Sequence, residues 1–447
     1  MSAGTATAGA LPSSAADAVG VPRLSSAKDA EGWSMQRRIL MFAAVVLVAI
    51  TCYAAICLYL KPTLAGRSIR DFSCFYRAGK MVRAGQGAKV YDFASEQQYD
   101  EMWRAELVAP GQHFMSQYFV SAPFILLIFA PLSCLTFAHA EVTWYWINAG
   151  MLLTYPFLLV GVLQRSKLLA LAVLATPFFI PVEIALIEGQ QSILLLLLFT
   201  VLFRELARGH EAASGCILAL STFKPQLALP MLLVLVVTRR WRAVAGFCAS
   251  CFALFWTCVA LVGWHTTLSF PRVLQEFNQI RGPAGIHPDI MINVRGMLYL
   301  LLHTQVSEFV LVVLTFAASV LLMIALVVTF RQPRQPISGL HFSLVVTLTL
   351  LASYHAYMHD LTLLLLPFLL VVSYLPQLPA TVPRVGLIVA IGAIPFILIS
   401  SPSYQQIVLR LSIALFAFAV LLFLEVVNTQ HVGSPVQATA VLPGSVG

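Results

Sequence analysis

Residues 309–330 read FVLVVLTFAASVLLMIALVVTF, a run of 22 residues without a charged side chain. A membrane-spanning α-helix needs about 20 predominantly apolar residues to cross a hydrocarbon layer about 30 Å thick. Within lipid, the chain must also satisfy its own backbone hydrogen bonds, which a helix does. The run therefore predicts a membrane-spanning helix.

The composition extends this prediction to most of the chain. Of the 447 residues, 59% are hydrophobic and 10% are charged. Soluble domains contain about 25% charged residues, so this chain has too few charges for a water-facing surface. Further apolar runs lie at about 118–137, 142–163, 168–186, 192–203, 215–237, 243–262, 342–354, 361–375, 385–399 and 407–427. With a first run at 39–60, they predict an all-α, polytopic integral membrane bundle of roughly ten to thirteen transmembrane helices.

Polar stretches divide the chain into one membrane domain and two tails. Residues 1–36 are rich in Ala, Ser and Gly, and we expect a disordered cytoplasmic tail. The membrane domain is predicted to cover residues 37–428, and residues 429–447 form a second disordered tail. Two polar segments interrupt the membrane domain, at about 61–117 and 263–294. Several apolar runs are short or contain proline, which indicates broken helices around a site.

The basic residues predict the orientation of the chain. The net charge is +8, and the Lys and Arg residues lie in short connections between apolar runs. They are not clustered as in a nucleic-acid-binding patch. Lys and Arg favour the cytoplasmic side, so Arg37 and Arg38 place the N-terminus inside and both polar segments outside. If every run crosses the membrane, Arg165 and Lys167 fall outside. Either that loop violates the rule, or one run in the first half does not cross.

Asp71 is the first candidate for chemistry. It opens a predicted amphipathic helix in the first outer segment, where a carboxylate can simply cap the helix. Basic and aromatic residues around it favour a second interpretation, in which the carboxylate abstracts a proton while cations hold a phosphate. The proposed substrate-binding neighbours are Arg70, Tyr76, Arg77 and Lys80.

The segment YHAYMHD, residues 354–360, is the second candidate. His355 and His359 are four residues apart and would share a helix face, which is also zinc-ligand spacing. No third ligand accompanies them in the sequence, so no metal site is predicted. Structural hydrogen bonding and a polar rim of an active site, which would include Asp360, both stay open.

Two polar breaks in apolar runs supply the remaining candidates. Glu188 and Gln190 flank a glycine between two such runs, and Lys224 and Gln226 flank Pro225 in another. A lysine at membrane depth needs a partner, which is either water reached by snorkelling or an anion such as a phosphate.

Signatures that would indicate other chemistry are absent from the sequence. There is no D-x-D pattern for a metal-held nucleotide sugar, no phosphate-binding G-x-x-x-x-G-K-[ST] loop for ATP, and no G-x-S-x-G nucleophile motif. No cofactor is predicted.

The sequence resembles glycosyltransferase family 87 from about residue 38 to residue 410. The resemblance rests on the order and spacing of short motifs: Asp71 with Phe75, Tyr76, Gly87 and Tyr91, Trp146 and Asn148 in WYWIN, Gly189-Gln190, Lys224-Pro225, RRW, and His359-Asp360. It implies a GT-C fold and an outer-face catalytic site in a bacterial inner membrane. It also implies a polyprenyl-phosphate sugar donor, with mannose the expected hexose, and a lipid or glycan acceptor.

By this resemblance Asp71 is the catalytic base, and Asn293 and Arg295 lie among the substrate-binding residues. Arg295 stands where we expect a serine in the family pattern. The main alternative is a multi-spanning transporter or a flippase for lipid-linked glycans, since broken helices suit transporters. A membrane-bound glycan ligase or polymerase is a second alternative with the same donor class.

Overall fold

The computed structural model describes residues 71–107, 117–159, 176–277, 279–280, 285–330, 337–378, 382–401 and 403–431, with a few isolated positions between 40 and 51. These residues form sixteen α-helices and no strand, which confirms the all-α prediction. The helices are α2 (Phe72–Arg83), α3 (Phe93–Leu107), α4 (Leu126–Leu132), α5 (Phe137–Leu159), α7 (Ile180–Glu188), α8 (Ser192–Ala207), α9 (Glu211–Leu220), α10 (Pro225–Val237), α11 (Trp241–Val262), α12 (Trp264–Phe277), α13 (Val294–Leu302), α14 (Glu308–Thr329), α15 (Gly339–Ala352), α16 (Leu365–Tyr374), α17 (Val382–Ser400) and α18 (Tyr404–His431).

Four of the described helices are long and apolar enough to cross a membrane: α11, α14, α17 and most of α18. On α14, the side chains of Phe309 and Phe316 are 76% and 71% exposed. Exposed apolar side chains along a whole helix require an apolar solvent, which is lipid. The polytopic membrane prediction is therefore confirmed.

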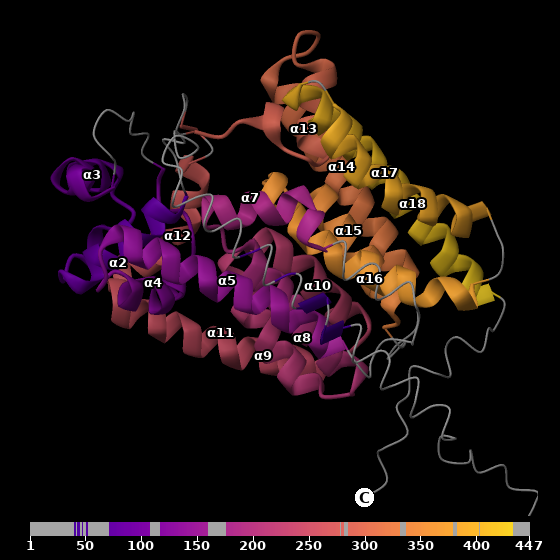
Figure 1. Cartoon of the computed structure of the whole chain (residues 1–447), viewed down its shortest axis with the longest axis horizontal. Coiled ribbons are helices and arrows are strands. Elements are labelled where there is room, and N and C mark those ends of the chain that lie inside the picture. Colours follow the sequence, from indigo (N-terminus) through magenta and orange to yellow (C-terminus); the bar gives the residue numbers. More distant parts are fainter. Residues whose placement is uncertain are drawn as a thin grey trace, which may run out of the picture.

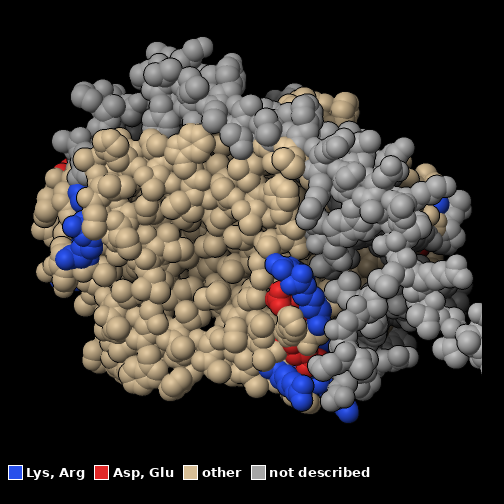
Figure 2. Space-filling model, turned by 60° about the horizontal axis from the view of Figure 1, so that its bottom comes forward, with Lys and Arg blue, Asp and Glu red and all other residues tan. Residues whose placement is uncertain are grey.

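The surface agrees with this placement. Figure 2 shows one broad face on which an area without visible charge separates Lys and Arg at the left margin from a mixed group of basic and acidic residues toward the lower right. Charged side chains at the two edges of an apolar band are typical of a protein that crosses a bilayer.

Several of the predicted apolar runs form shorter helices in the structure. Apolar helices of 10–17 residues cover Glu211–Phe223, Pro225–Val237, Gly339–Ala352 and Met358–Tyr374. Helix α15 is buried on all sides from Gly339 to Leu351. A helix that is hydrophobic all round lies in the core, so α15 forms the centre of the bundle rather than its lipid-facing wall.

The predicted run 118–137 does not form a straight span. Its short helices end at Leu132, and the following helix α5 turns away by 117°. Helix α4 has seven residues, which is about 10 Å at 1.5 Å per residue and too short to cross the membrane alone. This geometry agrees with the alternative in which one run of the first half does not cross; Arg165 and Lys167 themselves lie outside the described residues.

The amphipathic segment after Asp71 packs inside the protein. Helix α2 lies against α4, and a Cβ added to Gly79 would stand 2.4 Å from the carbonyl oxygen of Phe129. On the other side, Arg77 of α2 forms buried ion pairs with Glu96 and Asp100 of α3.

In Figure 1, α2–α12 fill the left and bottom of the molecule and α13–α18 the right and top. The short helix η6 (Met358–Leu364) packs on α7 and α8 between these groups.

Candidate active site

A cavity of about 1020 Å³ lies where three distant parts of the chain meet. Its walls come from the start of α2, from the residues between α12 and α13, and from the 354–360 segment, with α7, α8 and α10 between them. Predicted site residues that line it are Asp71, Glu188, Gln190, Lys224, Gln226, His355, His359 and Asp360. The structure therefore brings together the candidates that the sequence held far apart.

Gly189 fixes the position of Asp71. It ends α7 in the left-handed conformation, with φ at 68°, which a side chain would strain. A Cβ at this position would stand 2.6 Å from the Cβ of Phe72, so only glycine lets α2 approach this closely. The indole Nε1 of Trp144 donates to the Gly189 carbonyl over 2.8 Å and holds the turn. The result is that Asp71 and Gln190 are neighbours.

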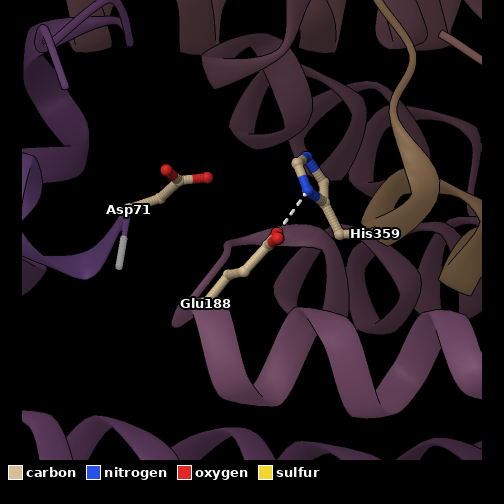
Figure 3. A group of neighbouring side chains, drawn as sticks. All are labelled: Asp71, Glu188 and His359. Carbon is tan, nitrogen blue, oxygen red and sulfur yellow. Dashed lines mark hydrogen bonds and ion pairs between the residues drawn. The ribbon is translucent and has the colours of Figure 1, made fainter. Parts of the chain in front are cut away.

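The Asp71 carboxylate points into the cavity toward two further charged groups. Gln190 donates a hydrogen bond from Nε2 to the carboxylate. One oxygen of Asp71, one oxygen of Glu188 and one ring nitrogen of His359 lie within 4.8 Å of one another (Figure 3). Burial, followed by repulsion from Glu188, raises the pKa of Asp71 above the ordinary range of an aspartate. A carboxylate with a raised pKa is a stronger base near neutral pH.

His359 lies between two carboxylates. Its Nδ1 is 2.8 Å from Oε2 of Glu188, and its Nε2 is 3.5 Å from Oδ2 of Asp360. A neutral imidazole has one nitrogen without a proton, and that nitrogen would face a carboxylate acceptor. Two carboxylates facing the two nitrogens therefore favour the doubly protonated, positively charged ring.

Lys224 forms an ion pair with Asp360. Ser192 joins the pair: its Oγ donates to Oδ1 of Asp360 over 3.0 Å and accepts from Nζ of Lys224 over 3.2 Å. The backbone N–H of Tyr357 donates to the other Asp360 oxygen over 3.1 Å. The cost of burying Lys224 is thus offset by Asp360, a partner that neither sequence interpretation considered. The ammonium still borders the cavity, with 13% of the side chain exposed.

Among the residues that the structure describes, the charges in this cluster do not cancel completely. Three carboxylates belong to Asp71, Glu188 and Asp360, and two cations to Lys224 and the protonated His359. Glu188 and Asp360 each have a cationic partner, whereas Asp71 is held by the neutral amide of Gln190. The excess negative charge therefore belongs to Asp71.

The expected cationic clamp next to Asp71 is not built by Arg77 and Lys80. Arg77 stands six residues after Asp71, and a helix rotates by about 100° per residue, so the two side chains point in different directions. Arg77 instead forms ion pairs with Glu96 and Asp100. Lys80 lies over the ring of Trp103, 4.7 Å from its centre. The third neighbour, Tyr76, is buried and donates from its hydroxyl to the Leu135 carbonyl over 2.9 Å; Arg70 lies outside the described residues.

Asn293 and Arg295 support the wall of the cavity instead of lining it. Asn293 is buried, caps α13 by accepting from Gly296 N over 2.8 Å, and donates to the Ser353 carbonyl over 2.9 Å. Arg295 stacks its guanidinium 3.9 Å from the centre of the Tyr354 ring, and Tyr354 does line the cavity.

Sequence reasoning missed two residues of the site, Ser192 and Tyr357. A serine at a helix start and a tyrosine between two histidines carry no signal until the fold shows what they contact. It also missed a candidate set of three metal ligands, because Asp71 and Glu188 approach His359 only in space. A metal ion there would compete with the hydrogen bond between Glu188 and His359.

Comparison with known proteins places the chain in a family. The family model described as glycosyltransferase family 87 matches residues 119–354, which is more than half of the chain. No curated protein and no solved structure matches it.

Proposed function

Because the chain belongs to glycosyltransferase family 87, it is a membrane glycosyltransferase, and we propose that it transfers a hexose from a polyprenyl-phosphate donor. The expected sugar is mannose, the acceptor a lipid or glycan, and the fold the GT-C type. The observation that carries the proposal is Asp71: a carboxylate without a cationic partner among the described residues, facing a cavity large enough for two substrates.

In the proposed reaction, Asp71 accepts the proton of an acceptor hydroxyl. The acceptor oxygen bonds to C1 of the donor sugar as the bond from C1 to the phosphate oxygen breaks. Attack from the face opposite the phosphate inverts the anomeric centre. The polyprenyl phosphate leaves with the electron pair of the broken bond.

The residues around Lys224 suit this leaving group. Among the described residues, Lys224 and His359 are the cations that border the cavity near Asp71. Helices α8 and α10 both begin at the cavity wall, at Gln191-Ser192 and at Lys224-Pro225. Helix N-termini attract anions through their free N–H groups and their dipole, so both ends can stabilise a phosphate. Broken helices at membrane depth commonly use their N-termini in this way.

We further propose that transfer needs no metal ion. Lys224 and His359 already supply two positive charges beside the leaving group, and Glu188, which a metal would need, is bonded to His359.

The site also fits an outer-face location in a bacterial inner membrane. Both polar segments that the positive-inside rule predicts to lie outside contribute residues to one cavity. The family assignment favours transfer over the transport alternative.

The test is Asp71→Asn in purified protein with labelled polyprenyl-phosphate mannose. Removing a general base costs about 10²–10⁴ in rate, whereas donor binding should stay close to that of the wild type. Asp92→Asn is the matched control, because Asp92 is an exposed aspartate in the same segment, bonded to Ser95 outside the cavity. Turnover by Asp71→Asn near the wild-type rate would remove Asp71 as the base. A wild type that transfers no sugar from any polyprenyl-phosphate donor would refute the proposed donor class.

A further inference from the structure

Part of the cavity wall is built from aromatic rings that the proposed reaction does not use. We call it the aromatic wall, and its members are Phe277, Tyr354, His355, Tyr357 and Tyr404. The rings of Phe277 and His355 are 5.9 Å apart between centres, and those of His355 and Tyr357 are 5.2 Å apart and perpendicular. Tyr357 is in turn 5.9 Å from His359. A continuous series of ring contacts thus leads from α12 to the carboxylate cluster.

The rings of the aromatic wall combine apolar faces with polar tips and are themselves uncharged. The Arg295 guanidinium lies 3.9 Å from the centre of the Tyr354 ring, but Arg295 does not line the cavity. Four of the wall's five rings have a hydroxyl or a ring nitrogen. Burial lowers the pKa of His355 to about 4, so its imidazole is neutral at pH 7. An uncharged surface of this kind has little to offer a phosphate, which the cations beside Asp71 suit better.

We propose that the aromatic wall is an acceptor subsite that binds a pyranose ring. This inference rests on the proposed function and names the class of its acceptor: a glycan or glycolipid with a sugar at its reacting end. The C–H faces of a pyranose carry a small positive charge and stack on the negative faces of aromatic rings. Its hydroxyl groups meanwhile find partners in the tyrosine hydroxyls and the His355 nitrogens.

The position of the wall matches the chemistry. His359 ends the series of rings and is bonded to Glu188, whose oxygen lies within 4.8 Å of Asp71. A sugar held on the neighbouring rings would therefore present a hydroxyl to the base. An isoprenoid tail fits the wall less well, because it would cover the polar tips of Tyr354, His355 and Tyr404 without offering a hydrogen bond, and each uncompensated polar group is costly.

The kinetic test compares two acceptors of equal chain length, octyl mannopyranoside and octanol, with a polyprenyl-phosphate mannose donor. We expect the glycoside to be preferred by at least about 100-fold in kcat/KM, because a site built to bond hydroxyl groups rejects a ligand that lacks them. Tyr404→Leu should raise the KM for the glycoside by about 3- to 10-fold and leave the donor KM unchanged. Tyr404→Phe keeps the ring and should recover most of the affinity. Trp264→Leu, at an exposed ring outside the cavity, is the control.

Binding without turnover separates this inference from the proposed function. Saturation-transfer NMR on the protein in nanodiscs should show the mannose ring of the glycoside in contact with wild type and Tyr404→Phe, and a weaker signal with Tyr404→Leu. If no transfer occurs but this pattern is found, the proposed function fails and the sugar subsite stands. If transfer occurs, two results would refute the subsite. One is a Tyr404→Leu variant whose acceptor KM is unchanged, whether or not its donor KM rises; the other is octanol serving as well as the glycoside.

Discussion

Replacing Glu188 by glutamine should move the pH dependence of transfer to lower pH. The proposed base, Asp71, would act only when deprotonated, so its raised pKa would set the acid limb of kcat/KM above the ordinary range of an aspartate. Repulsion from Glu188 is one of the causes that raise this pKa, after burial itself. Glutamine removes the negative charge, while its amide oxygen can still accept the hydrogen bond at His359 Nδ1.

The distance gives the size of the effect. The Asp71 and Glu188 oxygens lie within 4.8 Å of each other, and two unit charges at that upper limit interact with about 3.5 kcal/mol at an effective dielectric constant of about 20. Two facts reduce this figure: the Glu188 side chain is 34% exposed, and the His359 cation opposes it from a similar distance. If about a third to a half remains, the acid limb moves down by about one pH unit, since 1.36 kcal/mol corresponds to one unit.

The assay is kcat/KM for sugar transfer measured from pH 4 to pH 9 in wild type and Glu188→Gln. Glu183→Gln on the same helix is the matched control, because Glu183 does not line the cavity. Gln190→Leu tests the opposite sign: its hydrogen bond favours the Asp71 carboxylate, so its loss should move the limb to higher pH. Identical limbs in all variants, or an upward movement in Glu188→Gln, would refute the assignment of Asp71 as the titrating base.

Four further outcomes follow from the structure. Lys224→Gln should raise the KM for the lipid donor, and Lys224→Arg should recover only part of it, because a planar fork does not reproduce an ammonium; donor titration measures both. EDTA should leave the transfer rate unchanged, and a loss restored by manganese or zinc would contradict this. Gly189→Ala should lose most transfer activity in a protein that still folds, measured by rate and thermal melting, since the new Cβ displaces Phe72. Arg77→Met should destabilise the protein by about 3–5 kcal/mol, measured by thermal or denaturant unfolding in detergent, because Glu96 and Asp100 become buried charges without a cation between them.

The membrane character and the residues of the candidate site could be predicted from the sequence for a physical reason. Apolar runs and rare charges are properties of single residues, and lipid selects them without reference to the rest of the fold. An ionisable residue in such a chain has few uses other than function or pairing. Asp71, Glu188, Lys224 and His359 could therefore be found in the sequence, and the structure places all four at one cavity.

Partner choice could not be predicted, because it depends on directions that only the packed fold supplies. Arg77 stands six residues after Asp71 and was expected beside it, yet the helix turns it toward α3, where Glu96 and Asp100 compete for it. The choice between spanning and buried runs could not be predicted for a related reason. Hydropathy cannot distinguish a helix that crosses lipid from one, such as α15, that is buried among other helices.

Lys224 shows how a structural pairing and a function can coexist. The sequence posed a choice between snorkelling to water and binding a phosphate, and the structure gives the lysine an internal partner in Asp360. That pairing allows the cation to stay at membrane depth before the donor arrives. The Asp360 carboxylate also accepts hydrogen bonds from the Ser192 hydroxyl and the backbone N–H of Tyr357. With Lys224 and the nearby His359 ring, four donors surround it. A carboxylate so well satisfied can share Lys224 with an incoming phosphate without being left as an unpaired charge. On the proposed function, the ion pair would hold the cation ready for the donor, and Asp360→Asn tests this. The substitution should tighten the binding of polyprenyl phosphate if Lys224 binds the phosphate, and leave the affinity unchanged if the pair only stabilises the fold.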